Sequence, residues 1–361
     1  MKLAFLGTIK SFNYYQIGGT ESFIRRLASY ILQKGNEVDY ILYGAEENRE
    51  LTTSCGLTLN YLRSFEHALD AISHNYDHVI TIYLFPKDRL KYALFRKKNN
   101  ELITFHFIYF SWPNLSIKRK LYFSEARFFP YNGKLFCISK RQYEHVIQWS
   151  KNAVYILPPI PESYFLKPRE KPNNEKINVT FLGRVDPSKG INEIIEICKA
   201  LKNNNRFECC IYGIHIPEDK KSLEIHNWLK NQEEIKYIEV DRRRYSPMVE
   251  DFVGRVLKKT DVFAQFYQKL SSTIDTPMLL LEAMASLCAV ITKPFGNIPD
   301  VYGYSKFTFD KKNFIPNVID FLNIISIEEI VKERERIYRQ NKKLNFKAKK
   351  IGSQFMKAIN D

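Results

Sequence analysis

The sequence lacks any long, uninterrupted apolar run. Its first seven residues include an apolar stretch that is too short for a signal peptide and is typical of a first β-strand. No segment reaches the roughly 20 apolar residues that a membrane-spanning helix needs. The sequence therefore predicts a chain that crosses no membrane, and we expect it in the cytoplasm.

The six cysteines do not have the spacing of a metal site. None belongs to a paired C-x-x-C motif, so a zinc site is not expected. Five of the six lie in or beside apolar segments, where free cysteines are usually buried. We therefore expect reduced thiols and a reducing compartment.

The phosphate-binding loop of P-loop enzymes is also absent. Gly18-Gly19 follows a predicted strand and precedes a predicted helix, but no Lys-Ser or Lys-Thr pair follows it. A glycine pair lets the backbone approach a ligand closely, and the N-terminus of the helix attracts anions. A tight turn explains the same pair, so both interpretations stay open.

Positive charge, in contrast, is in excess. The chain has 55 Lys and Arg against 40 Asp and Glu, which gives a formal net charge of +15. Such a surplus points to acidic partners, such as sugar nucleotides, phospholipid head groups or nucleic acid. Because no helix-turn-helix, zinc-finger or RNA-binding aromatic signature accompanies it, nucleic acid is not the expected partner.

Short apolar segments alternate with amphipathic ones along the chain. The alternation is typical of α/β folds with parallel sheets. The predicted strands cover residues 3–6, 37–42, 78–83, 102–107 and 134–138 in the first half, and 178–182, 207–212, 261–266 and 289–292 in the second. The predicted helices cover residues 21–33, 191–201 and 278–286, and a charged helix ends the chain.

A proline-rich segment at residues 157–161 interrupts this alternation, and a polar stretch with two more prolines follows at 167–176. Prolines stiffen a linker, and polar residues keep it solvated. We therefore place a domain boundary here, so that residues 1–160 form the first domain and residues 161–335 the second. Residues 336–361 are expected to form a helix that packs back on the first domain.

Two cations follow the first strand of the second domain. The strand ends in Gly183-Arg184, and Lys189 stands directly before Gly190 and the next helix. Arginine can grip phosphate oxygens through two parallel hydrogen bonds, and lysine adds a point charge. The pair therefore suits a diphosphate, although two solvated surface charges would give the same pattern.

A single carboxylate interrupts an apolar helix later in the second domain. Glu282 lies in the run from Met278 to Ala285, and Asp275 precedes this run. A charge in such a run is rarely buried without a partner. A ribose diol is one possible partner of Glu282, and a helix face that points to water is the alternative.

Together these segments resemble the retaining GT-B glycosyltransferases of family 4. Gly18-Gly19 resembles the family's first loop, Gly183-Arg184 with Lys189-Gly190 its donor-diphosphate site, and Glu282-Ala283-Met284-Ala285 the second half of its paired-glutamate motif. Thr104-Phe105-His106, Phe136-Cys137-Ile138-Ser139 and Leu157-Pro158-Pro159 are similar to further family segments in the same order. The resemblance implies an α/β fold of two Rossmann-like domains that face each other across a cleft.

The resemblance also implies roles for these residues. Arg184 and Lys189 would neutralise the leaving diphosphate, and Glu282 would hold the ribose. His106 would end its strand beside the anomeric carbon and act as a catalytic residue. Gly18, Gly19 and Gly183 would allow close backbone contact with the donor. The donor would be a UDP- or GDP-linked sugar and the acceptor a glycan or a lipid-linked molecule, with no metal and no further cofactor.

The sequence departs from the family pattern at one central position. The first glutamate of the pair should lie eight residues before Glu282, where Ile274 stands. Asp275, its neighbour, would then reach the donor sugar instead. A GT-B-shaped partner subunit without activity is therefore an alternative, as are a nucleic-acid-directed glycosyltransferase and a nucleotide-sugar epimerase.

A basic segment with interleaved aromatic and aliphatic residues covers positions 87–98 of the first domain. A segment of this kind can rest on an anionic membrane or guide a phosphorylated lipid acceptor. A solvated helix face is the alternative. Its cations are Lys87, Arg89, Lys91, Arg96, Lys97 and Lys98. We expect a peripheral membrane contact here.

Overall fold

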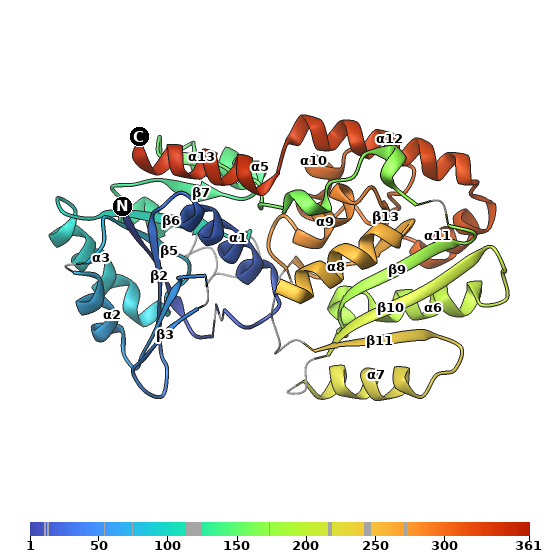
Figure 1. Cartoon of the computed structure of the whole chain (residues 1–361), viewed down its shortest axis with the longest axis horizontal. Coiled ribbons are helices and arrows are strands. Elements are labelled where there is room, and N and C mark those ends of the chain that lie inside the picture. Colours follow the sequence, from blue (N-terminus) through green and yellow to red (C-terminus); the bar gives the residue numbers. More distant parts are fainter. Residues whose placement is uncertain are drawn as a thin grey trace. The chain divides into compact units, whose positions relative to one another are not determined.

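The computed structural model describes residues 1–10, 12, 14–53, 55–73, 75–112, 125–172, 174–215, 219–241, 247–270 and 273–361. The chain divides into two compact units (Figure 1). The first unit contains Met1–Pro159 and Phe346–Asp361, and the second contains Ile160–Asn345. The end of the chain differs from the expected single helix at 336–361, because residues 336–344 continue a helix of the second unit and only the last helix belongs to the first unit.

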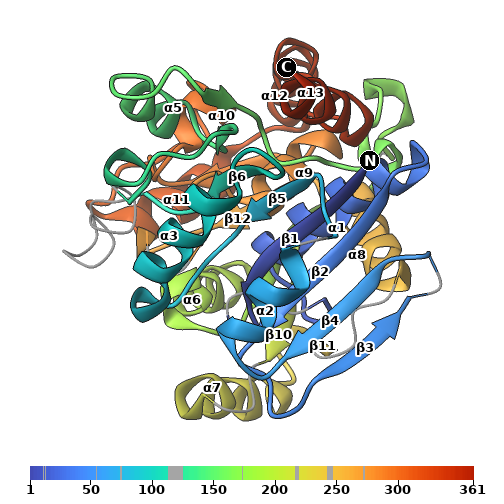
Figure 2. The same ribbon diagram turned by 90° about the vertical axis from the view of Figure 1, so that its left-hand side faces the viewer.

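The first unit is built on an eight-stranded sheet with the order β3-β4-β2-β1-β5-β6-β7-β8. All neighbouring strands are parallel except β3, which pairs antiparallel with β4 at the edge. Central β1 is buried in six of its seven residues, as expected for a strand covered on both faces. Figure 2 shows β1, β2 and β4 side by side. The strands are β1 Lys2–Thr8, β2 Glu37–Tyr43, β3 Arg49–Thr52, β4 Thr58–Leu62, β5 His78–Thr81, β6 Thr104–Tyr109, β7 Leu135–Cys137 and β8 Ala153–Tyr155.

Helices cover this sheet, and the last helix of the chain packs against the first. The close approach depends on Gly352, where an added Cβ would stand 2.3 Å from the ring of Tyr30. A larger residue would push the C-terminal helix away from its partner. The helices of this unit include α1 Gly19–Gln33, α2 Phe65–Ile72, α3 Arg89–Asn99, α5 Lys140–Val146 and α13 Ala348–Asn360.

The second unit has a five-stranded, all-parallel sheet with the order β11-β10-β9-β12-β13. The chain lays down β9, β10 and β11 toward one edge and then returns to place β12 and β13 on the other side of β9. Ligands of open α/β sheets bind outside the carboxyl ends of the strands at such a reversal. The strands are β9 Ile177–Arg184, β10 Phe207–His215, β11 Lys236–Asp241, β12 Val262–Gln265 and β13 Ala289–Thr292.

The helices of the second unit bury apolar stripes against this sheet. Ile191, Ile194, Ile195, Cys198 and Leu201 recur at helical spacing on α6 and belong to the hydrophobic core. The helices include α6 Ile191–Leu201, α7 Lys220–Lys230, α8 Pro247–Lys259, α9 Met278–Ala285, α10 Ile298–Tyr302, α11 Phe314–Ile324 and α12 Ile327–Leu344. Among the described residues, no helix is both long and apolar enough to cross a bilayer.

Every strand predicted from the sequence is present, with its ends shifted by a few residues, and the prediction of two α/β domains with parallel sheets is confirmed. The strands that the sequence did not reveal are short or polar, such as β3, all of whose residues are exposed. The six cysteines are free, and four of them are buried.

Candidate functional site

The reversal of strand order in the second unit lies between β9 and β12, and the segments that follow these strands carry two of the predicted site residues. Arg184 is the last residue of β9, and Lys189 closes a short 3-10 turn, Pro187–Lys189. The Asp186 carboxylate caps this turn by accepting a hydrogen bond from the Ser188 backbone N–H at 2.7 Å. The turn therefore holds Lys189 in place directly before α6.

Gly190 brings this turn against the end of β12. Its φ of +86° lies in the left-handed region, which favours glycine. An added Cβ would stand 2.4 Å from the Cβ of Phe266 and 2.7 Å from its carbonyl oxygen. The backbone N–H of Gln268 also donates to the Ser188 carbonyl at 2.9 Å. The two loops are thus fixed to each other, and with them the cations of one loop and the residues after β12.

Lys189 is nearly buried, with 7% of its surface exposed. Its Nζ lies 4.3 Å from the ring centroid of Tyr267, in the geometry of a cation–π contact. Burial, and next the Arg184 guanidinium, lower its pKa to about 7, although Asp186 opposes this shift. Holding two cations together in a poorly solvated place is unfavourable, and such an arrangement is common where an anion binds.

Tyr267 lies beside Lys189, and its phenol is affected by the charges of both Arg184 and Glu282. Burial raises its pKa to about 12, and both the Arg184 guanidinium, which lowers it, and the Glu282 carboxylate, which raises it, act on the phenol. Glu282 is 5% exposed and belongs to α9, whose described residues are almost all buried. Lys189 therefore contacts the Tyr267 ring, and the charges of Arg184 and Glu282 both act on its phenol. Tyr267 was not predicted from the sequence, although its place just after β12, the strand beside the reversal, was a usable signal.

The segment before α9 is buried as well. Asp275 is 5% exposed and Ile274 is 8% exposed, so the isoleucine packs as an apolar side chain where the family motif has a carboxylate. The Thr276 hydroxyl accepts a hydrogen bond from the Asn297 amide at 2.7 Å, which ties this segment to the start of α10. Asp275 is thereby left as the buried carboxylate closest in sequence to the missing glutamate.

A further ion pair, also missed in the sequence, borders the site. Lys293 is 6% exposed and its Nζ lies 3.4 Å from the Glu193 carboxylate on α6. The Gln268 side-chain amide donates to the same carboxylate. The pair follows β13 and joins the carboxyl edge of the sheet to the first turn of α6. Among the described residues there is no cluster of three or more His, Cys, Asp and Glu side chains with metal-site geometry.

In the first unit, Gly18 caps α1 with extended backbone, and Gly19 is the first residue of that helix. An added Cβ on Gly18 would stand 2.2 Å from an oxygen of the Glu21 carboxylate. Gly18 therefore makes room for a side chain of its own helix. Both glycines follow a strand and begin a helix, as predicted. The Glu21 carboxylate, however, lies at the N-terminus of α1, where we expected a ligand anion.

The prediction that His106 ends its strand is wrong. β6 continues three residues further to Tyr109, and His106 is 1% exposed. Its Nδ1 accepts from the Lys134 backbone N–H at 2.9 Å, and its Nε2 lies 3.0 Å from Nδ1 of His78, the first residue of β5. These contacts place the ring toward the amino edge of the sheet, away from the carboxyl ends of the strands. Burial, and next His78, lower its pKa to about 3, so the imidazole is neutral.

The basic segment at 87–98 is only partly a solvent-exposed surface. The Arg96 guanidinium donates to the carbonyls of Pro130 and Phe129 and stacks on the Tyr131 ring at 3.5 Å. Arg89 lies 3.3 Å from the Glu125 carboxylate, and Lys91 pairs with Glu66. The outer face of α3 keeps Leu90 and Leu94 exposed, at 59% and 63%.

Comparisons with known proteins identify the family of this chain. The chain belongs to the glycosyl transferases group 1 family, whose model matches residues 164–344, half of the chain and almost all of the second unit. The predicted class, a glycosyltransferase, is thereby confirmed. A search of curated protein sequences finds no match to this chain.

Solved structures with the GT-B fold match the chain over its whole length. The chain is similar to Anabaena HepE in complex with UDP and glucose, with a TM-score of 0.71, 12% identity and 100% of both chains covered. It is similar to sucrose-phosphate synthase from Thermosynechococcus elongatus, with a TM-score of 0.67, 13% identity, and 99% and 98% of the chains covered. An alpha-glucosyltransferase in complex with UDP matches at a TM-score of 0.61, 11% identity and 100% of both chains. At these identities the likeness establishes the GT-B fold.

Proposed function

We propose that this chain transfers a sugar from a UDP- or GDP-linked donor to a glycan or a lipid-linked acceptor, with retention at the anomeric carbon and without a metal ion. The observation that carries the proposal is the pair of cations Arg184 and Lys189 at the strand-order reversal of the second unit. The family membership and the UDP held by two of the similar structures support it. UDP is accordingly the first nucleotide to test.

In this proposal Arg184 and Lys189 stabilise the negative charge that develops on the diphosphate as it leaves. Preorganised cations are most effective in a poorly solvated place, and Lys189 is nine-tenths buried. The Glu282 carboxylate accepts hydrogen bonds from the ribose hydroxyls, and Asp275 reaches the donor sugar in place of the family's first glutamate. Retention follows if the acceptor hydroxyl enters on the face that the leaving group vacates.

Calorimetric titration with UDP, GDP and the corresponding sugar nucleotides tests the proposal directly. We expect binding of at least one nucleotide, and its loss in a variant with both Arg184→Met and Lys189→Met. Lys236→Met and Lys306→Met together make a matched control, because both lysines are exposed members of surface ion pairs of the same unit. Equal nucleotide affinity in the double variant and the wild type would contradict the assignment of the donor site.

A non-catalytic role remains a second candidate because Ile274 is buried where a family carboxylate stands. The variant Ile274→Glu separates the two functions. If the wild type binds UDP but neither hydrolyses nor transfers any sugar from a panel of nucleotide sugars, and Ile274→Glu gains that activity, the chain is a binding subunit. Turnover by the wild type excludes this candidate.

We also propose that the outer face of α3 touches anionic membrane. The exposed residues at helical spacing are Leu90, Lys91, Leu94, Lys97 and Lys98 of α3, together with Lys87 in the 3-10 turn directly before it. Exposed leucines among lysines suit the boundary between acyl chains and anionic head groups. Co-sedimentation with vesicles of phosphatidylglycerol and phosphatidylcholine checks this. We expect Leu90→Glu with Leu94→Glu to abolish binding, while Ile324→Glu, at an 80% exposed position of the second unit, leaves it intact.

A further inference from the structure

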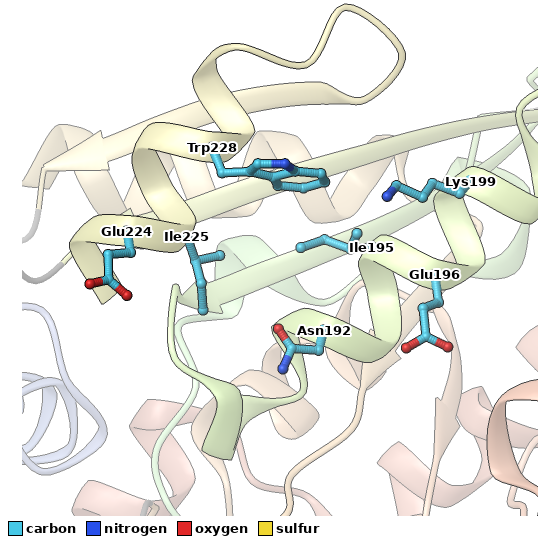
Figure 3. A pocket seen from close by; sticks show the side chains of 7 residues that line it. All are labelled: Asn192, Ile195, Glu196, Lys199, Glu224, Ile225 and Trp228. Carbon is cyan, nitrogen blue, oxygen red and sulfur yellow. The ribbon is translucent and has the colours of Figure 1, made fainter. Parts of the chain in front are cut away.

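A groove of about 490 Å³ lies on the helical face of the second unit, between α6 and α7. Asn192, Ile195, Glu196 and Lys199 line it from α6, and Glu224, Ile225 and Trp228 line it from α7 (Figure 3). Its volume falls within the range of about 300–1,000 Å³ that is typical of small-ligand sites. None of these residues belongs to the donor site, and the groove opens to solvent outside the sheet.

The indole of Trp228 is the central feature of the groove. In Figure 3 the ring lies over Ile195, and the amide of Asn192 points into the space below it. Trp228 is 37% exposed, and the Lys199 ammonium lies 4.8 Å from its ring centroid. A large aromatic surface that remains partly exposed in a folded chain is a frequent anchor for ligands and partners.

The charge of the groove separates it from the other surfaces of this basic protein. Two carboxylates, from Glu196 and Glu224, and one ammonium, from Lys199, line it. In Figure 3 both carboxylates point away from the indole, along the rim. Glu224 also lies 4.0 Å from the Lys220 ammonium on the same helix, so the charges around the groove balance, although the whole chain carries +15. The groove therefore offers no surplus of positive charge to nucleotides, phosphorylated lipids or anionic membranes.

A neutral, hydroxyl-rich ligand fits the remaining chemistry. The C–H face of a pyranose ring is apolar and can stack on an indole and an isoleucine, while its hydroxyls both donate and accept hydrogen bonds. Asn192, Glu196, Glu224 and Lys199 supply donors and acceptors around the apolar floor. We propose that this groove binds an uncharged oligosaccharide segment, at a site separate from the donor site.

The position of the groove suggests why an oligosaccharide would bind there. This step rests on the proposed function, the transfer of a sugar to an acceptor. Asn192 is the second residue of α6, so one end of the groove begins close to Lys189 and the carboxyl edge of the sheet. From there to Lys199 the helix rises about 10 Å. A glycan acceptor held in the groove would have its reactive end retained near the enzyme, which raises the effective concentration of that end.

Calorimetry with maltohexaose, cellohexaose and hexa-N-acetylchitohexaose tests the proposal. We expect at least one of them to bind the wild type in the millimolar range and Trp228→Ala to weaken that binding about tenfold or more. Asn192→Ala and Glu224→Ala, both at exposed positions, should each weaken it a few-fold. Tyr304→Ala is the matched control, because Tyr304 is an almost fully exposed aromatic residue of the same unit outside the groove.

Binding of none of the three sugars to the wild type, or binding that survives Trp228→Ala, overturns the proposal. UDP titration of the same samples keeps the two proposals apart. Trp228→Ala should bind UDP like the wild type, which also shows that the variant is folded. Sugar binding without binding of either UDP or GDP would overturn the proposed donor site and leave the groove in place, and nucleotide binding without sugar binding would overturn only the groove.

Discussion

The carboxyl edges of the two sheets differ in how their charged side chains are paired. In the first unit the charged groups at this edge are used by the chain itself: Arg25 donates to the carbonyls of Tyr14 and Gln16 at 2.6 and 2.8 Å, and Glu21 lies against Gly18. In the second unit burial, and next the Arg184 guanidinium, lower the pKa of Lys189 to about 7. The first arrangement stabilises the fold, whereas the second lowers the stability of the folded chain, a cost that the donor diphosphate offsets in our proposal.

The largest effect in this comparison is expected at Gly190. A Gly190→Ala variant combines a left-handed backbone with a Cβ that would stand 2.4 Å from Phe266, so we expect a loss of roughly 2–5 kcal/mol of unfolding free energy. Gly35→Ala is the matched control, since Gly35 has a φ of +74° and no heavy atom within 4 Å of the added Cβ. Strain alone should cost about 1–2 kcal/mol there. Urea unfolding measures both, and equal losses would mean that contact with Phe266 does not matter.

His106 should behave as a structural residue of the first unit. His106→Ala leaves the Lys134 N–H without its acceptor and opens space in a fully buried place, so we expect a loss of roughly 2–4 kcal/mol. Sugar transfer per folded molecule should stay unchanged, because the ring lies toward the amino edge. Urea unfolding and kcat, measured on the same samples, check this. A variant of normal stability with kcat lowered a hundredfold or more would restore the catalytic role predicted from the sequence.

The outcomes for His106 and Tyr267 show how much of the site the sequence can reveal. Hydrophobic periodicity located the strands of both sheets, because burial on two faces leaves a strong pattern. It placed Arg184 at a strand end and Lys189 just before the next helix. It could not show that β6 continues to Tyr109, since strand ends depend on pairing with neighbouring strands. Tyr267 was missed for a similar reason, because its proximity to Lys189 depends on Gly190 packing against Phe266.

A smaller effect is expected when the charge of Lys189 is removed. This change should weaken UDP binding but raise the stability of the folded chain at low pH. Lys189→Met keeps the apolar stem and removes the charge, so we expect UDP affinity to fall by roughly 1.5–3 kcal/mol, on the order of tenfold to a hundredfold. The folded-state pKa of about 7 lies below the ordinary 10.5, so the folded state binds fewer protons than the unfolded state between these values. Wild-type stability therefore rises with pH across this window, and the penalty is complete below pH 7.

Thermal unfolding of Lys189→Met and the wild type between pH 7 and 10.5 checks the expected pH dependence of stability. The variant should be the more stable protein below pH 7, and the difference should shrink as the pH rises toward 10.5. Lys236→Met, which loses an exposed lysine paired with Glu208, should show no such trend. A variant that is less stable than the wild type at low pH would mean that Lys189 is stabilised by its surroundings.

The smallest expected effect is the uptake of a proton when UDP binds. If Lys189 contacts the bound diphosphate, the negative charge raises the pKa of the lysine, because an opposite charge nearby favours the protonated form. At about pH 8 the free protein holds this lysine mostly neutral, so UDP binding should take up close to one proton per site, and the affinity should fall as the pH rises above 7. Titration in buffers of different ionisation enthalpy measures the uptake. Lys189→Met should take up none, and a variant that still does would move the titrating group, and with it the centre of the anion site, away from Lys189.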